Sequence, residues 1–183
     1  MRRVVVTRTY LALDGPGQLR RPARAVPGAA FALRAPCSVA EYRRLYASVG
    51  AQWYWHERLA WSDATLAAYL ARPDVFVWEA MLDDASAGYF ELRRDDAGAV
   101  EIAYFGLIRQ FIGRGLGGAM LARAVDEGFA LGATRVWLHT CTLDSPHALP
   151  NYSARGFRTF KTERLEVEIE GTKVVAERTL DSA

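Results

Sequence analysis

The stretch Gln110-Phe111-Ile112-Gly113-Arg114-Gly115-Leu116-Gly117-Gly118 decides the fold of this chain. An apolar run at residues 100–108 predicts a strand before it, and apolar side chains at helical spacing over residues 115–131 predict a helix after it. A glycine-rich turn between a strand and a helix directs several backbone N–H groups one way, and the helix N-terminus adds partial positive charge. The stretch therefore predicts a phosphate or pyrophosphate site, to which Arg114 and Arg109 add positive charge.

The glycine spacing fits more than one kind of phosphate site. Gly113, Gly115 and Gly118 also satisfy the dinucleotide fingerprint G-x-G-x-x-G. That fingerprint requires an acidic residue about 20 residues further on, and Asp144, the next acid after the following strand begins, comes too late. A P-loop is excluded because no Gly-Lys-Ser/Thr follows. Two interpretations remain: an acyl-CoA pyrophosphate loop, Gln/Arg-x-x-Gly-x-Gly/Ala, in register with Gln110, and a purely structural glycine turn.

Two further segments strengthen the acyl-CoA interpretation. Residues 100–107 form an apolar strand directly before the loop, and residues 147–157 end in Tyr152-x-x-x-Gly156-Phe157. With these motifs in this order, the chain resembles the GCN5-related N-acetyltransferase (GNAT) superfamily over roughly residues 31–161. The resemblance implies a mixed α/β fold with a central, mostly antiparallel sheet of six to seven strands. The fourth and fifth strands would splay apart, about four helices would flank the sheet, and an extra strand would precede it.

The resemblance implies acetyl-CoA as the acyl donor. Its thioester arm would lie between the splayed strands, where a free backbone N–H near residues 106–108 would polarise the thioester carbonyl. Ser145 stands where many members have an asparagine that bonds the cofactor, so this contact departs from the family pattern. The residues expected to bind the cofactor are Leu107, Ile108, Arg109, Gln110, Ile112, Gly113, Arg114, Gly115, Leu116, Gly117, Gly118 and Ser145.

The implied reaction transfers the acyl group to an amine, and it needs a base and an acid. An alkyl ammonium has a pKa of about 10.4, so a base must remove its proton at neutral pH. Glu101 is the first candidate, and strand alternation predicts that it shares a face with Ala103, Phe105 and Leu107. A structural carboxylate paired with an arginine is the competing interpretation.

His139 is the second candidate base, because an imidazole titrates close to neutral pH. A strand histidine bonded to the backbone is the competing interpretation. Tyr152 matches the family's general acid, four residues before Gly156, and a phenol with a pKa of about 10 can protonate the departing thiolate. The competing interpretation of Tyr152 is an aromatic residue packed in the core.

Composition agrees with an ordinary globular enzyme. The 183 residues predict a single domain, 1–183, with an N-terminal strand and loop at 1–30, a core at 31–161 and a hairpin at 162–183. A net charge of +2 argues against nucleic-acid or membrane binding, and the basic cluster at residues 20–24 is better explained as a solvated loop. No apolar run approaches the roughly 20 residues of a membrane helix, and the apolar core at residues 4–6 is too short to predict a signal peptide.

Cysteine and histidine usage excludes several other classes. Cys37 and Cys141 form neither a disulfide framework nor a metal pattern, and the three histidines lack metal-ligand spacing, so no metal is expected. These features favour a reducing cytoplasm.

Turn-forming residues, helix-capping residues and apolar runs along the chain predict the remaining elements. Strands are expected at residues 3–13, 31–35, 75–82, 87–94 and 135–141, and a hairpin at 157–168 and 172–178. A loop is expected at 14–30. Helices should begin at Ser38, with Glu41 in a capping box, at Ser62, and at Ser145, with Pro146 in the first helical position.

The acceptor is poorly determined. An aromatic segment, residues 53–61, would line the acceptor pocket in the resembling family, although packing between helices explains most of its rings better. Glu57 and Asp63 are candidate anchors for an amine. The predicted acceptor is a small-molecule amine or a peptide N-terminus, and a homodimer is left open. The alternative function is a non-catalytic acyl-CoA-binding or sensor domain of the same fold, with a dinucleotide oxidoreductase a distant third.

Overall fold

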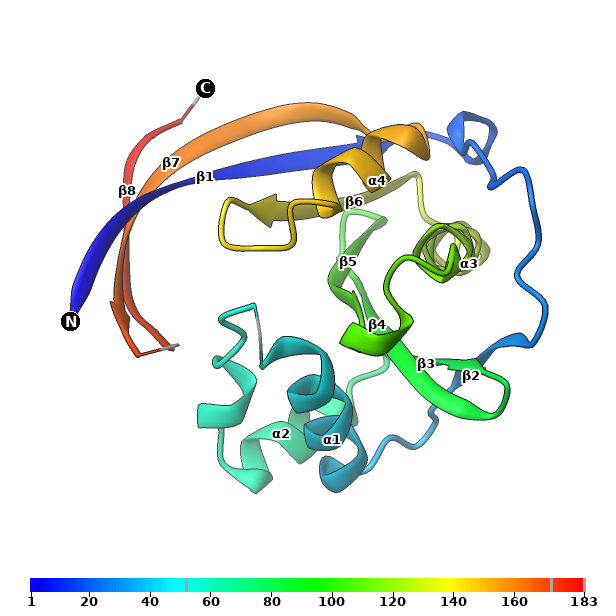
Figure 1. The fold of residues 1–183 in the computed structure, drawn as a ribbon, viewed down its shortest axis with the longest axis horizontal. Helices are drawn as coiled ribbons and strands as arrows, with labels where there is room; N and C mark the ends of the chain where they lie inside the picture. Colours follow the sequence, from blue (N-terminus) through cyan, green and yellow to red (C-terminus); the bar gives the residue numbers. More distant parts are fainter. Residues whose placement is uncertain (52, 172, 183) are drawn as a thin grey trace.

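A computed structural model describes residues 1–51, 53–171 and 173–182, and its centre is one mixed sheet of eight strands (Figure 1). The strand order is β2-β3-β4-β5-β6-β1-β7-β8. The strands are β1 (Arg2–Leu13), β2 (Ala29–Leu33), β3 (Val75–Leu82), β4 (Ala85–Arg94), β5 (Ala99–Leu107), β6 (Arg135–Cys141), β7 (Arg158–Glu170) and β8 (Lys173–Ser182). The α-helices are α1 (Val39–Gly50), α2 (Asp63–Leu70), α3 (Leu116–Ala130) and α4 (Ala148–Ala154). The predicted mixed α/β class is confirmed.

The N-terminal strand is inserted inside the sheet. β1 pairs antiparallel with β6 on one side and β7 on the other, so Tyr10 lies opposite both His139 and Lys161. The far part of β1 continues with β7 and β8 as a curved arm that carries both chain ends (Figure 1). The arm buries Val6 and Leu165 on its inner face. Because all three predicted segments contribute strands to one sheet, they are joined by hydrogen bonding; the domain division itself stays a prediction.

Helices cover the two faces of the sheet and define two cores. On one face α1 and α2 pack over β3 to β5 around Tyr42, Tyr46 and Tyr89. On the other face α3 packs over β4 to β6 around Met120 and Val125. We call these the α1 face and the α3 face.

Capping residues set where these helices begin. Ser38 and Glu41 form the predicted capping box, with Glu41 N–H donating to Ser38 Oγ at 3.2 Å. Ser62 caps α2 in the same way, accepting from the Thr65 N–H at 3.1 Å. The helix starts predicted at Ser38 and Ser62 are therefore confirmed.

The splayed pair of strands is confirmed. β5 and β6 run parallel and pair only from Ala99 to Glu101, opposite Arg135 to Trp137. Beyond Glu101 the strands separate, so the edge of β5 that faces β6 has no sheet partner there. This gap positions the candidate site.

A β-bulge at Ala103 corrects one prediction. Glu91 lies opposite Tyr104 and Leu92 opposite Ile102, so Ala103 is an extra residue in β5. The bulge shifts the two-residue alternation by one. Glu101 consequently lies on the α1 face with Tyr104, whereas Phe105 and Leu107 pack on the α3 face. The predicted grouping of Glu101 with Phe105 and Leu107 is wrong.

The last helix begins later than predicted. α4 starts at Ala148 with His147 as its N-cap, so Pro146 is not at the first helical position. The His147 N–H donates to Ser145 Oγ at 3.3 Å, and the Ala148 N–H donates to the Ser145 C=O at 2.9 Å. These bonds close a turn over Ser145 to Ala148 and delay the helix.

The other element boundaries shift by a few residues. The strand predicted at 31–35 is β2, which begins at Ala29, and the predicted hairpin is β7 and β8. The predicted start of its second strand, at residue 172, and the last residue of the predicted domain, 183, lie outside the described residues. Within the described part of the chain, no helix is long and apolar enough to cross a membrane.

Candidate active site

A cavity of about 460 Å³ occupies the gap between β5 and β6. Phe105 and Leu107 line it from the α3 face, and Tyr104 and His139 line it from the α1 face. The lining of the cavity therefore comes from both faces of the sheet. Of the predicted residues, it is lined by Leu107, Ile112, Gly113, Gly115, Gly117, Gly118, His139, Ser145 and Tyr152.

The glycine loop brings backbone rather than side chains to the cavity. Gly113 and Gly115 have φ angles of +85° and +80°, a left-handed conformation that favours glycine. Apart from the residues next to Gly113 in the chain, no heavy atom of the described residues lies within 4 Å of the position that a Cβ on Gly113 would occupy, which leaves room for an anion. Gly115 caps α3, a helix of 15 residues, so the first-turn N–H groups lie directly beside this space.

The remaining predicted loop residues lie around the cavity rather than in its lining. Arg109, Gln110 and Arg114 are exposed at the surface of the loop. Leu116 is fully buried among Phe111 and its neighbours, so only its backbone remains for a ligand. The Ile108 side chain packs in the same cluster, and its N–H donates to the Ala87 C=O at 2.9 Å.

The Ile108 bond fixes which backbone groups face the gap. Antiparallel partners alternate between hydrogen-bonded and non-hydrogen-bonded pairs. Because Ile108 bonds toward β4, Leu107 turns its N–H and C=O toward the gap instead. Within the predicted range of residues 106–108, the N–H that faces the gap is therefore that of Leu107.

Tyr152 lies on the cavity wall, on the α3 face. It is 6% exposed, and its ring contacts Phe105 edge-on at 6.0 Å between centroids. Burial and the nearby charge of Asp144 both raise the pKa of the Tyr152 phenol. The hydroxyl therefore keeps its proton at neutral pH and can donate it into the cavity.

Glu101 and His139 meet where the strands begin to separate. His139 Nδ1 lies 3.6 Å from Glu101 Oε1, while Glu101 Oε2 accepts a hydrogen bond from Arg93. Burial alone would raise the pKa of the Glu101 carboxyl, but the contact with His139 and the charge of Arg93 outweigh it and lower this pKa. His139 lines the cavity, whereas Glu101 stands behind it, 6% exposed. A ligand in the cavity would therefore contact the imidazole before the Glu101 carboxylate.

The aromatic segment divides between packing and lining. Trp53 and Trp55 line the cavity, and Trp55 also packs edge-on against Tyr104 at 5.1 Å. Trp61 lies away from the cavity lining, stacked under the Arg58 guanidinium at 4.0 Å. Glu57 accepts a hydrogen bond from the Tyr104 hydroxyl at 3.2 Å. Asp63, the other candidate anchor, pairs with Arg43 at the start of α2.

Sequence reasoning missed several lining residues. Arg8 and Cys141 lie opposite each other on β1 and β6, and both line the cavity. Asn151 also lines it, beside Gly117. Their signal was weak because β1 enters the sheet from a distant part of the chain. Within the described residues, no group of three or more metal-ligating side chains gathers.

The sheet and its gap place the chain in a class of acetyltransferase folds. The sequence matches the acetyltransferase (GNAT) family over residues 42–157. This match covers more than half of the chain, and the protein belongs to the GNAT family. No curated protein matches the sequence.

Solved structures share the fold at low sequence identity. A GCN5-related N-acetyltransferase from Kribbella flavida has a TM-score of 0.63 and 21% identity, over 90% of this chain and 58% of its own. A GCN5-related N-acetyltransferase from Sphaerobacter thermophilus has a TM-score of 0.62 and 19% identity, over 93% of this chain and 55% of its own. An aminoglycoside acetyltransferase from an uncultured soil metagenomic sample has a TM-score of 0.59 and 14% identity, over 70% of this chain and 87% of its own. The chain spans about three fifths of the first of these structures.

Proposed function

We propose that the protein is an acetyl-CoA-dependent N-acetyltransferase acting on an amine of a small molecule or a peptide N-terminus. One observation carries the proposal: a single cavity joins the glycine loop on the α3 face to His139 on the α1 face, with Tyr152 in its wall. Donor and acceptor would enter from opposite faces and meet in the gap, so the amine would attack the acyl group directly.

The residues present fit the donor. The open space beside Gly113 and the first turn of α3 would take the pyrophosphate. The unpaired edge of β5 would pair with the amides of the pantetheine arm, as a neighbouring strand would. Ser145, which lines the cavity, would offer its hydroxyl in place of the family's asparagine. Acetyl-CoA, when bound, supplies an acyl carbon activated as a thioester.

His139 would act as the base. Its imidazole lines the cavity and would accept the proton of the acceptor ammonium, directly or through water. Glu101 would orient the ring through Nδ1 and stabilise the imidazolium that forms. This assigns Glu101 a positioning role, because its low pKa and its bond to Arg93 make it a weak base.

Two donors would serve the acyl group and the leaving sulfur. The Leu107 N–H would donate to the thioester carbonyl, where negative charge develops during attack. The Tyr152 hydroxyl would donate its proton to the departing thiolate. Both groups lie on the part of β5 and α4 that lines the α3 side of the gap.

The acceptor class rests on the α1 face. Trp53, Trp55 and Tyr104 present aromatic rings, and Glu57 adds a carboxylate at the surface. Such a set attracts an ammonium by cation–π contact and charge. An aminoglycoside, the substrate class in the name of one similar structure, is one amine of this kind. The cytoplasmic location stays a prediction.

Calorimetric titration with acetyl-CoA, with NADH as the control, tests the proposal first. Saturable one-site binding of acetyl-CoA alone is expected, followed by thiol release with an amine or peptide acceptor. Absence of acetyl-CoA binding would overturn the assignment.

Tyr152→Phe separates an enzyme from a non-catalytic acyl-CoA sensor. Turnover should fall by about 10²-fold while acetyl-CoA affinity stays constant. A protein that binds acetyl-CoA but never releases thiol with any acceptor would favour the sensor. Unchanged turnover in the variant would remove Tyr152 from the mechanism.

A further inference from the structure

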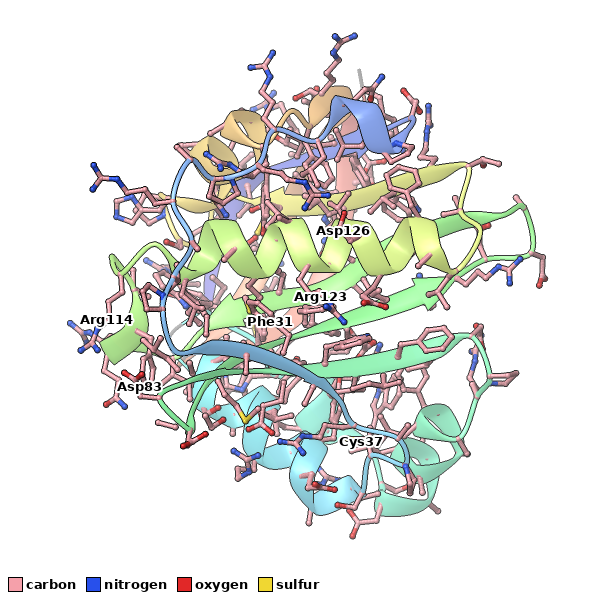
Figure 2. All side chains as sticks on the ribbon, turned by 90° about the vertical axis from the view of Figure 1, so that its right-hand side faces the viewer. Phe31, Cys37, Asp83, Arg114, Arg123 and Asp126 are labelled. Carbon is pink, nitrogen blue, oxygen red and sulfur yellow. The ribbon has the colours of Figure 1, made fainter. Side chains whose placement is uncertain are left out.

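Tyr10, on the inserted strand β1, lies directly opposite His139 on β6. The adjacent pair, Leu11 and Leu138, packs in the core beneath α3, which lies across the strands on that face (Figure 2). Because successive residues of a strand point to opposite faces, Tyr10 and His139 both turn to the α1 face. β1 thus brings an aromatic ring to the proposed base from outside residues 42–157, the part of the chain that matches the family.

The rings of Tyr10 and His139 are in contact. Their centroids are 5.6 Å apart, and their planes are inclined by 37°, nearer to parallel than to perpendicular. A cation within about 6 Å of the centroid of a tyrosine ring is attracted by the negative face of its π system. The imidazole becomes such a cation when it accepts a proton. Trp137, which also lies near His139, is 6.4 Å away and beyond this range.

The far end of Tyr10 is fixed by polar contacts on β7. Its hydroxyl donates a hydrogen bond to Glu163 Oε2 at 2.6 Å. Lys161 Nζ lies 5.1 Å from the centroid of the same ring, but its charge is balanced by Glu163 Oε1 at 2.5 Å. The ring is therefore already in place beside His139, and no reorganisation is needed when charge develops there.

We propose that Tyr10 is a positioning residue for His139: its ring orients the imidazole and stabilises the imidazolium that forms during proton transfer. This inference rests on the proposed function, because it deepens the role of the base in that reaction. In this step an N–H bond of the acceptor ammonium breaks, its electron pair stays on the amine nitrogen, and the proton bonds to His139 Nε2. Glu101 and Tyr10 then act on one cation from two sides, the carboxylate at Nδ1 and the phenol ring against the imidazole ring.

Rates of thiol release at saturating acetyl-CoA and acceptor test this role. Tyr10→Leu keeps an apolar side chain but removes the π face, so kcat should fall by about three- to tenfold with KM for acetyl-CoA unchanged. Tyr10→Phe keeps the ring and should retain most of the wild-type rate. Phe160→Leu is the matched control and should keep the wild-type kcat. It removes a ring that also packs against Tyr10, at 6.1 Å, but lies one strand further from His139.

Two further measurements separate the contact with His139 from a general packing role. In the His139→Gln background no imidazolium forms, so Tyr10→Leu should cause no additional loss of kcat. Phenylalanine analogues with one, two or three ring fluorines in place of Tyr10 weaken the π face while changing the size of the ring little. The rate should fall stepwise along this series, which also serves if Tyr10→Leu does not fold.

The outcomes separate this inference from the proposed function. An unchanged kcat in Tyr10→Leu, an equal fractional loss with and without His139, or a rate independent of fluorination would overturn the role of Tyr10 while the acetyltransferase proposal stands. A wild type that releases no thiol with any amine or peptide acceptor would overturn the proposed function, and this inference with it.

Discussion

Two buried glutamates on the α1 face of the sheet differ in their partners and therefore in what they can do. Glu91, fully buried, accepts hydrogen bonds from the hydroxyls of Tyr42 and Tyr69, with Arg58 Nη2 at 3.5 Å. Burial raises the pKa of the Glu91 carboxyl despite these contacts. Glu101, also buried but held by Arg93 and His139, has a lowered pKa.

The difference follows from access to the cavity. The donors around Glu91 come from α1, α2 and the loop before α2, so they tie these elements to the sheet. The donors around Glu101 include His139, whose ring lines the gap. A buried carboxylate whose partners are all buried stabilises the fold, whereas one with a partner in the cavity, such as Glu101, is also positioned for the proposed chemistry. Each centre can be removed without touching the other.

The largest effect is expected from Glu91→Ala. The substitution leaves two buried phenols and the Arg58 guanidinium without their acceptor, so the free energy of unfolding should fall by about 3–5 kcal/mol. Urea denaturation followed by tryptophan fluorescence measures this loss. Glu91→Gln, which keeps an acceptor oxygen, is the control and should lose less. A loss below about 1 kcal/mol in the alanine variant would show that the phenols, not the carboxylate, hold the cluster.

His139→Gln should reduce turnover strongly and stability little, in contrast to the stability loss expected for Glu91→Ala. Loss of the proposed base is expected to lower kcat by about 10²-fold, with little change in unfolding free energy because the ring is partly exposed. Rates of thiol release at saturating acetyl-CoA measure the loss. An unchanged kcat in the variant would remove His139 from the proposed mechanism.

Glu101→Gln should have a smaller effect on rate. Glutamine can still contact His139 Nδ1, but it carries no charge to stabilise the imidazolium, so kcat should fall by about tenfold with KM for acetyl-CoA unchanged. Glu101→Asp, which keeps the charge on a shorter side chain, should recover part of the loss. If kcat falls as far as in His139→Gln, Glu101 itself is the base.

The sequence predicted the glycine-loop end of the cavity better than the end on the α1 face. The Gly113 to Gly118 loop and α3 depend on local chemistry: glycine at positive φ, a helix start, and helical periodicity. Such features involve neighbouring residues and leave a pattern in the sequence. Tyr152 is similarly fixed by its spacing to Gly156, and the structure places it in the cavity wall.

The α1-face end of the cavity depends on strand register, which no local pattern in the sequence predicts. The bulge at Ala103 exists only relative to β4, and it moved Glu101 to the α1 face. Its contact with His139 requires β5 and β6 to pair over three residues across a long separation in sequence. Arg8 reaches the cavity because β1 is inserted beside β6. Residues that meet through such pairings can be recognised once the sheet order is known.

The smallest expected effect concerns pH: the contributions of Glu101 and Glu91 to folding stability should change with pH in opposite directions. The pKa of Glu101 is lowered in the folded state, so its contribution to stability is present above the unfolded value of 4.5 and is lost as pH falls through the folded pKa. The pKa of Glu91 is raised, so its contribution is present below 4.5 and is lost as pH rises through the folded pKa. Substitution by glutamine removes the titrating carboxyl group at either position.

The difference in unfolding free energy between the wild type and Glu101→Gln should therefore widen from acid to neutral pH, while the difference between the wild type and Glu91→Gln should narrow. Urea denaturation of the three proteins on either side of pH 4.5 measures both differences, and two differences that move in the same direction would show that the carboxylates share one environment.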